Sequence, residues 1–352
     1  MRGADEEKRH VSHERRRFMA GVSALGAGAL LPSCATEGGA RMSGSQIERN
    51  KAVAMRFKKL QGTQDEPKIE SEVLAPGYKR LRGGMLNLAN NARDQGFPAT
   101  GAYLRGAFPD RVDVVEQVIA DGDRVGLLFR LTGTHKGNLF GLPPTGKKVD
   151  VHEAAILRIV DGRVVEGWFL ADEAGLLKQL GAGLPKRKDG KVIAPPITRE
   201  GLSGDAMYAR LQARAPATEA ERNKLVVSSS KTSKPPKGYR AEDYKQLRQG
   251  FQHLRDYGVA NGVAKQTPTL ALPDRADLID DLLAEGDSVW MKFKIAGTQT
   301  GPLYGHPATH RRIEIPEIGV ARFAEGKWKT GWYFGDELGM MLQLGALHML
   351  KA

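Results

Sequence analysis

The second half of this chain repeats the first. Residues 167–181 read GWFLADEAGLLKQLG, and residues 331–345 read GWYFGDELGMMLQLG. The offset of 164 residues holds without a gap back to AFPDR at 107 and ALPDR at 271, and about 28 of 75 positions are identical. This period is the length of a whole domain, not of a solenoid repeat. The chain of 352 residues is therefore predicted to contain two copies of one domain.

The two copies share one order of predicted elements. Helical sequence comes first, at 46–60 in one copy and about 241–256 in the other, and segments that alternate with a period of two follow it, as strands do. The pair Asp161-Gly162 predicts a hairpin turn, and a closing helix at 173–180 is expected to end at Gly181. This order predicts an α+β fold with helices on one face of a curved antiparallel sheet.

The predicted boundaries follow from the repeat and from composition. Prolines and a run of charges at 186–191 argue against a packed element between the copies. The prediction is a signal at 1–34, a tether at 35–45, a first domain at 46–183, a linker at 184–220 and a second domain at 221–350.

The net charge of +12 is spread along the chain. Its local basic runs, such as Lys186–Lys188 and Lys231–Lys237, fall in loop-like sequence without interleaved aromatic residues. A nucleic-acid-binding surface would concentrate these charges on one face. No nucleic-acid partner is therefore predicted.

The N-terminus has the pattern of an export signal. The segment ERRRFM at 14–19 resembles a twin-arginine motif, and the apolar run at 18–31 is too short to span a bilayer. LPSC at 31–34 resembles a bacterial lipobox, with Cys34 as the lipidated residue; cleavage after Ala35 is the alternative. We expect a periplasmic or cell-envelope lipoprotein, exported by the twin-arginine route, that touches the membrane only through its lipid anchor.

Several repeated motifs carry a family resemblance. The AFPDR segment, the FGLPPTG loop at 140–146 and the ending Trp-x-x-x-Asp-Glu-x-Gly resemble the SnoaL-like ester (polyketide) cyclases. That family belongs to the nuclear transport factor 2-like superfamily of cone-shaped α+β domains. The resemblance implies a deep pocket between the sheet and the N-terminal helices in each copy. It also implies that the two domains pack sheet to sheet, as an intramolecular pseudo-dimer.

The resemblance also assigns candidate site residues. Family cyclases use an Asp after the Trp strand as acid and base in a cofactor-free intramolecular aldol closure, and this Asp matches Asp172 and Asp336. A carboxylate in an apolar pocket has a raised pKa and can accept such a proton. The alternative is that both residues are helix N-caps, because Asp is favoured at that position. Strand parity adds four candidate pocket walls: Trp168, Leu170, Trp332 and Phe334.

Other features leave the chemistry open. Arg158 and Arg322 occur in both copies and are either a clamp for an anionic ligand in the pocket or exposed partners of neighbouring strands. The family often has a His before the Trp, where this chain has Gly167 and Gly331. Neither a metal nor a cofactor is predicted, because no set of ligands has suitable spacing.

Three functions remain open at this point. The first is a cofactor-free cyclase or isomerase that uses Asp172 and Asp336. The second is a non-catalytic protein that binds a small apolar or anionic organic ligand in the cell envelope. The third is a scaffold protein whose cone-shaped domains have collapsed and leave no interior pocket. The direction of the two Asp side chains distinguishes the first function from the other two.

Overall fold

The structure is a computed structural model that describes residues 43–61, 63–97, 101–248 and 251–351. The predicted signal, Cys34 and most of the predicted tether lie outside these residues. Of the helices that are described, none has the length and apolar composition needed to cross a bilayer.

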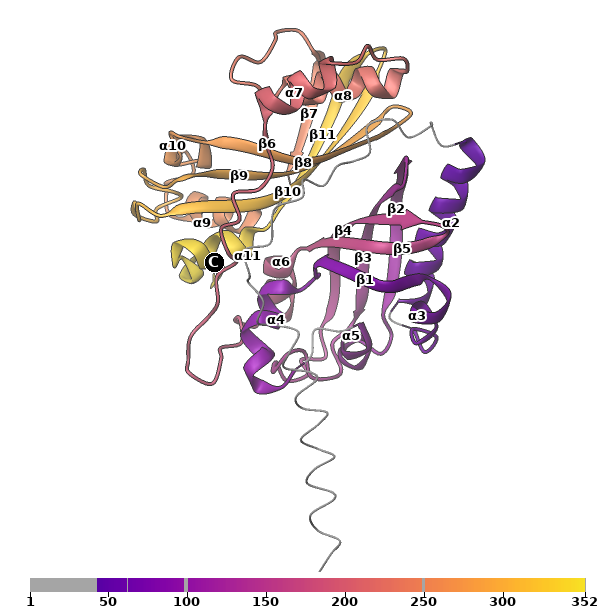
Figure 1. Cartoon of the computed structure of the whole chain (residues 1–352). Coiled ribbons are helices and arrows are strands. Elements are labelled where there is room, and N and C mark those ends of the chain that lie inside the picture. The colour runs from indigo at the N-terminus through magenta and orange to yellow at the C-terminus, as the bar shows by residue number, and fades with distance from the viewer. Residues whose placement is uncertain (1–42, 62, 98–100, 249–250, 352) are drawn as a thin grey trace, which may run out of the picture. The chain divides into compact units, whose positions relative to one another are not determined.

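The first repeat begins with helices and closes with a helix, as the sequence predicts (Figure 1). Its elements are α2 (Gly44–Leu60), α3 (Lys68–Glu72), β1 (Leu74–Arg82), α4 (Leu86–Ala92), η1 (Arg93–Gln95), α5 (Gly101–Ala107), β2 (Val112–Asp121), β3 (Arg124–Thr134), β4 (Lys148–Val160), β5 (Arg163–Ala171) and α6 (Glu173–Leu180).

The second repeat has the same order. Its elements are α8 (Glu219–Ser229), β7 (Arg240–Arg248), α9 (Gln252–Ala260), α10 (Pro268–Ala271), β8 (Ala276–Glu285), β9 (Ser288–Thr298), β10 (Arg312–Ala324), β11 (Lys327–Gly335), α11 (Glu337–Leu344) and η2 (Leu347–Lys351).

Each repeat contains one mixed sheet. The strand orders are β1-β5-β4-β3-β2 in the first sheet and β6-β8-β9-β10-β11-β7 in the second, where β6 is the short strand Leu202–Ser203. The strands pair antiparallel except at one edge, where β1 runs parallel to β5 and β7 runs parallel to β11. The α+β class and the tandem arrangement agree with the sequence prediction, whereas the parallel edge strands were not foreseen.

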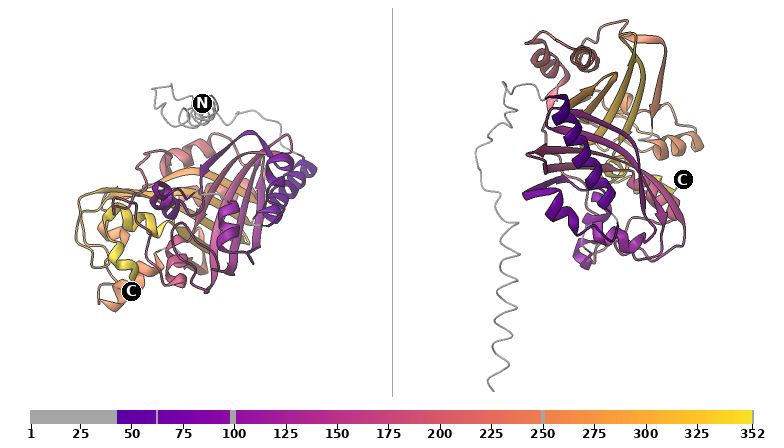
Figure 2. Two further views of the ribbon diagram at one scale, coloured as in Figure 1. Left: turned by 90° about the horizontal axis from the view of Figure 1, so that it is seen from below. Right: turned by 90° about the vertical axis from the view of Figure 1, so that its right-hand side faces the viewer.

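Helix α2 covers one face of the first sheet, as Figures 1 and 2 show. It buries Ala54, Phe57 and Leu60 at the spacing of one helical face, against strand residues such as Phe129 and Phe169. Ser43 caps its first turn, because the Ser43 side chain accepts a hydrogen bond from the backbone N–H of Gln46. The interior of the first repeat therefore lies between this helix and the sheet.

The predicted turn signals have the expected geometry. The β4–β5 turn places Asp161 and Gly162 at φ of 50° and 74°, and the β10–β11 turn places Glu325 and Gly326 at φ of 52° and 71°. Positive φ at both central residues matches the twist of the flanking strands. Helix α6 ends at Gly181, with φ of 62°.

Two segments differ from the sequence prediction. Residues 240–248 form strand β7 where a helix was expected, because pairing with β11 overrides the helical propensity of this polar segment. Within the predicted linker at 184–220, residues Leu202–Ser203 form β6 and Gly204–Gln212 form α7. Helix α7 is capped by Ser203 and buries Met207, so this part of the linker is packed.

The two sheets share a hydrophobic core through their other faces. Large side chains from both repeats meet there: Ile119, Leu128, Ile156, Trp168 and Leu170 from the first, and Leu283, Trp290, Ile318, Val320 and Phe334 from the second. Strands β2 and β8 also contact each other. This packing agrees with the sheet-to-sheet pseudo-dimer that the family resemblance implies.

Reciprocal polar contacts border this shared core. Asp121 Oδ2 accepts a hydrogen bond from the Ala284 backbone at 2.8 Å, and Glu285 Oε2 accepts one from the Ala120 backbone at 2.9 Å. The two pairs are related by the 164-residue offset. The repeats are therefore joined by an approximate twofold relationship, as in a symmetric dimer.

Replacing Trp290 by Ala tests the shared core. Trp290 is fully buried, and its ring lies 3.0 Å from the position that a Cβ on Gly126 of the other sheet would take. We expect Trp290→Ala to lower the free energy of unfolding by roughly 3–5 kcal/mol, because a large cavity would open between the sheets. Urea denaturation measures this change.

The control is Val160→Ala, on the exposed part of β4, which should change stability by less than about 0.5 kcal/mol. Equal stability of the Trp290→Ala and Val160→Ala variants would contradict a shared core.

Candidate functional site at the junction and in the second repeat

Asp172 and Asp336 are N-caps of the closing helices. Oδ1 of Asp172 accepts a hydrogen bond from the Gly175 backbone at 2.8 Å, and Oδ1 of Asp336 accepts one from Gly339 at 2.9 Å. In both cases a Cβ on the glycine would come within 2.3 Å of the carboxylate, so the glycine allows the close approach. This geometry is the capping arrangement that the sequence left open as an alternative.

Asp336 also binds the other repeat. Its Oδ2 accepts a hydrogen bond from Arg82 Nη2 at 2.7 Å, and its Oδ1 accepts one from Asn87 Nδ2 at 3.1 Å. The Asp336 side chain is only 2% exposed. Both carboxylate oxygens of Asp336 therefore accept hydrogen bonds from the first repeat. Its position makes it a link between the repeats.

Asp172 meets a different residue at the equivalent place. His253 is the second residue of α9, as Asn87 is of α4, and the His253 side chain acts electrostatically on Asp172. Burial raises the pKa of Asp172 and lowers the pKa of His253. Oδ2 of Asp172 makes no hydrogen bond within the described residues, and Nδ1 of His253 is buried without a partner there. Asp172 therefore keeps one oxygen available, unlike Asp336.

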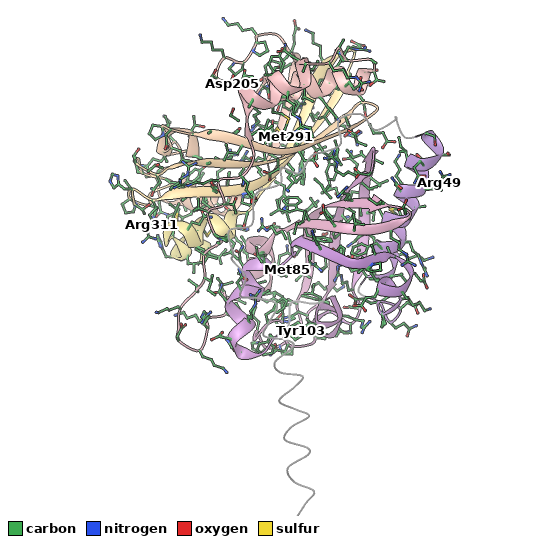
Figure 3. The ribbon with its side chains drawn as sticks, in the orientation of Figure 1. Arg49, Met85, Tyr103, Asp205, Met291 and Arg311 are labelled. Carbon is green, nitrogen blue, oxygen red and sulfur yellow. The ribbon has the colours of Figure 1, made fainter. Side chains whose placement is uncertain are left out.

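The two junctions differ because two equivalent arginines point to different partners. Arg82 ends β1 and Arg248 ends β7, each three residues before a residue in the left-handed region. These residues are Met85, labelled in Figure 3, and Phe251. Whereas Arg82 crosses to Asp336, Arg248 stays in its own repeat and binds Glu317 at 2.5 Å. Duplication has thus produced two sites of unlike chemistry.

Glu173 and Glu337 follow the capping aspartates and hold the next helix of their own repeat. Glu173 accepts hydrogen bonds from the backbone N–H groups of Asn87 and Leu88, and Glu337 accepts one from that of Leu254. Burial raises the pKa of each carboxyl to about 8. The nearby carboxylates, Asp336 for Glu173 and Asp172 for Glu337, contribute to this raised pKa. Both are therefore largely protonated at neutral pH.

The predicted pocket walls lie between the two sheets. Trp168, Leu170 and Phe334 belong to the shared core, and Trp332 packs against it. A ligand could contact these side chains only if the sheets separated. Their predicted role as walls of an interior pocket is therefore not supported by their position, because strand parity directs them to the face opposite the helices.

Arg158 and Arg322 lie on exposed strand faces. Arg158 Nε is 2.8 Å from Asp123 Oδ2, and Arg322 Nη1 is 2.9 Å from Asp287 Oδ1. Their side chains are 48% and 44% exposed. The structure places neither inside a cone, so the surface-pair interpretation fits them and the clamp interpretation does not.

The interior of the first repeat contains three charged side chains that were not singled out from the sequence: Lys58, Arg111 and Asp113. Lys58 Nζ lies 2.6 Å from Asp113 Oδ2 and 3.3 Å from the centre of the Phe129 ring. Arg111 binds the same carboxylate through two nitrogens, each at 2.9 Å. Burial lowers the pKa of Lys58 to about 8 and raises that of the neighbouring Glu153. Such a buried cluster is costly unless all its members are paired.

The second repeat contains the same cluster. Lys231, Arg275 and Asp277 form the equivalent pairs, and Lys231 lies over Phe293. Glu317 occupies the position of Glu153, and its side chain is 1% exposed. Burial raises the pKa of Glu317. The shared motif Pro-Asp-Arg-x-Asp and the repeated Glu were the available signal, because charged residues kept inside strands of both copies have a structural or chemical role.

The second repeat also contains a pocket of about 370 Å³, and no member of this cluster is among its described lining residues. Its walls come from the end of β7, from α9, from residues 264–267 and from the loop before β10, and include Arg248, Phe251, Arg255, Lys265 and Tyr304. The volume lies within the range of small-molecule sites. Arg248 joins this pocket to Glu317. Among the described residues, no group of His, Cys, Asp and Glu is arranged to hold a metal ion.

The protonated glutamates make stability depend on pH. Glu173 and Glu337 have folded-state pKa values of about 8, above the ordinary value of 4.5, so the folded chain binds more protons than the unfolded chain between these values. We expect the free energy of unfolding to fall as pH rises from about 4.5 to about 8, by on the order of a few kcal/mol. Denaturant titrations across this range measure it.

The matched variant is Glu173→Gln combined with Glu337→Gln, which keeps one accepting oxygen at each site, loses one of the two backbone bonds of Glu173, and removes the titration. In this variant the free energy of unfolding should change less with pH than in the wild type. A wild-type slope of the opposite sign, or an unchanged slope in the variant, would contradict the raised pKa values.

Comparisons with known proteins agree with this architecture. A family model described as SnoaL-like polyketide cyclase matches residues 89–180 and 241–344, which together make up more than half of the chain. Aklanonic acid methyl ester cyclase DauD of Streptomyces sp. (strain C5) is 30% identical over 106 residues, 30% of this chain and 66% of that protein. Nogalonic acid methyl ester cyclase of Streptomyces nogalater is 29% identical over 115 residues, 32% of this chain and 84% of that protein.

A solved structure from Jannaschia sp. CCS1, described as a candidate SnoaL-like polyketide cyclase, is 23% identical. The match has a TM-score of 0.33 and covers 41% of this chain and 99% of the other. The match to DauD spans 66% of that protein. The match to aklanonic acid methyl ester cyclase DnrD of Streptomyces peucetius spans 63% of that protein, so both are slightly less than two thirds. With two matching regions in one sequence, the chain belongs to the SnoaL-like polyketide cyclase family.

Proposed function

We propose that the protein is a cofactor-free enzyme that moves a proton at a carbon next to a carbonyl group, as ring closure by a cyclase requires. The proposed reaction site is the pocket of the second repeat, and Glu317 is the proposed acid and base. The alternative is that the protein binds a small organic ligand without transforming it.

The observation that carries this proposal is the position of Glu317. Its carboxyl group is buried, its pKa is raised by burial, and it is bound to Arg248, which lines a pocket of small-molecule size. A carboxyl with a raised pKa can both take and return a proton near neutral pH. Arg248 keeps the carboxylate oriented and can also stabilise negative charge that develops on a nearby oxygen.

Glu317→Gln tests the acid–base role. We expect kcat to fall by about 10²-fold or more, because general acid–base catalysis contributes 10²–10⁴-fold in typical enzymes. The substrates to test are aklanonic acid methyl ester, nogalonic acid methyl ester and the two corresponding free acids, with products followed by mass spectrometry. The wild-type kcat should rise with pH through the pKa of Glu317, and the variant should lose this limb.

The matched control is Glu153→Gln, the same change at the equivalent position of the first repeat. There the equivalent arginine, Arg82, is bound to Asp336 and makes no hydrogen bond to Glu153 within the described residues. Activity of this variant should remain within a few-fold of wild type. A larger loss in Glu153→Gln than in Glu317→Gln would move the reaction site to the first repeat.

A second candidate for the base is Asp172, which the family resemblance favours. Its support is the free Oδ2 atom and the nearby His253. Asp172→Asn keeps an oxygen for the capping bond and removes the charge. A loss of about 10²-fold in this variant, with Glu317→Gln active, would assign the role to Asp172 instead. Asp336 is a weaker candidate, because Arg82 and Asn87 already bind its carboxylate. If no variant changes turnover, the non-catalytic alternative stands.

We also propose that the protein is exported and held at the cell envelope by a lipid on Cys34. The support is sequence alone: the arginine run at 15–17, the apolar run at 18–31 and the lipobox-like residues before Cys34. Mass spectrometry of the mature N-terminus should find a chain that begins at a diacylglyceryl-modified Cys34. An unmodified chain beginning at Thr36 would reject the lipidation.

A further inference from the structure

The pocket of the second repeat carries positive charge that no acidic wall residue balances. Arg248, Arg255 and Lys265 line it, and none of its lining residues is acidic. We infer that this pocket binds an organic carboxylate, with its charged group near these three cations and its apolar body against Phe251 and Val259. This inference rests on the proposed reaction pocket and names the class of its ligand.

Arg255 has an uncharged counterpart in the first repeat. The backbone N–H of Arg255 bonds the carbonyl of Phe251 at 3.0 Å, and that of Ala89 bonds the carbonyl of Met85 at 2.9 Å. The two residues therefore occupy the same place in the first turn of equivalent helices. In the first repeat this place is held by a buried alanine. A cation appears only where the described pocket lies.

Two of the three cations have no counter-ion. The side chains of Arg255 and Lys265 are exposed and make no hydrogen bond or ion pair within the residues that the structure describes, whereas Arg248 binds Glu317 and lies over the Phe251 ring. Both cations are therefore free to pair with a ligand carboxylate that enters the pocket. Arginine is suited to this role, because its planar group can bind both carboxylate oxygens at once.

The apolar part of the pocket is held in place before any ligand binds. The backbone of Tyr304 donates a hydrogen bond to the Gln266 carbonyl at 2.9 Å, and Gly305 donates one to the Gln266 side chain at 2.8 Å. Tyr304 also packs so closely on α9 that a Cβ on Gly258 would lie 2.8 Å from its ring. Walls fixed in this way reduce the entropy lost on binding.

Tyr304 adds a neutral donor to the cations. Burial raises the pKa of Tyr304, so its hydroxyl group stays protonated at neutral pH. A volume of about 370 Å³ admits a small ring system and excludes a folded polymer such as nucleic acid. The combination of cations, one hydroxyl and apolar walls fits a small aromatic or polycyclic carboxylate.

Three naphthalene probes of similar size test the inference by equilibrium binding. They are 2-naphthoate, its neutral methyl ester and the cationic 2-naphthylmethylammonium ion. We expect wild-type protein to bind 2-naphthoate about tenfold or more tighter than the ester, and the ammonium probe weakest. Arg255→Gln and Lys265→Gln should each weaken naphthoate binding about three- to tenfold and leave ester binding unchanged. Added salt should reduce the difference between naphthoate and ester.

The control is Lys329→Gln, an exposed lysine of the same repeat paired with Asp243, which should not change naphthoate binding. Equal affinity for naphthoate and its ester, or equal effects of Lys329→Gln and Arg255→Gln, would overturn the inference. Binding is measured without turnover. Equal probe affinities together with lost turnover in Glu317→Gln would therefore reject the carboxylate ligand and keep the proposed reaction. Tighter binding of naphthoate than of its ester, together with unchanged turnover in Glu317→Gln, would keep the carboxylate ligand and reject the proposed reaction.

Discussion

Burial of the two sheet faces against each other is the interaction on which the rest of this structure depends. Each sheet has helices on one face and large apolar side chains on the other, so either repeat alone would expose a face that includes Trp168 or Trp290. Apolar burial of this kind is the main favourable term in folding and association. Because both faces belong to one chain, the association does not depend on protein concentration. Every junction contact between the repeats follows from this arrangement.

Joining two domains in one chain also allows them to diverge. A symmetric dimer must place identical residues at both ends of its interface, whereas a tandem repeat need not. Here Asn87 faces Asp336 at one end and His253 acts on Asp172 at the other. The arginine that secures Asp336 has a counterpart that instead binds Glu317 beside a pocket. At one end of the junction, the Asp336 carboxylate is fully hydrogen-bonded. At the other end, Asp172 and His253 each keep an atom that makes no hydrogen bond within the described residues.

Much of the fold could be predicted from the sequence because its signals are local. The 164-residue repeat indicated two domains, the alternating segments indicated strands, and Asp161-Gly162 indicated a hairpin that the structure contains. The edge strand β7 was predicted as a helix, because its polar residues become a strand only through pairing with β11, which lies about 90 residues later in the chain. Helix α7 was missed for a similar reason, since Met207 is buried against residues distant in sequence.

The candidate site was less predictable, because it depends on where side chains point and on which repeat they meet. The sequence by itself determined the family and the duplication, since these are encoded in contiguous motifs, and it singled out Asp172 and Asp336 without deciding whether they cap their helices. Only the tertiary structure decided that Trp168 and Leu170 face the other sheet, that Arg82 crosses to Asp336, and that Arg248 stays beside Glu317. The physical reason is that charges and apolar faces are satisfied by partners distant in sequence, and these partners come together only when the two sheets pack.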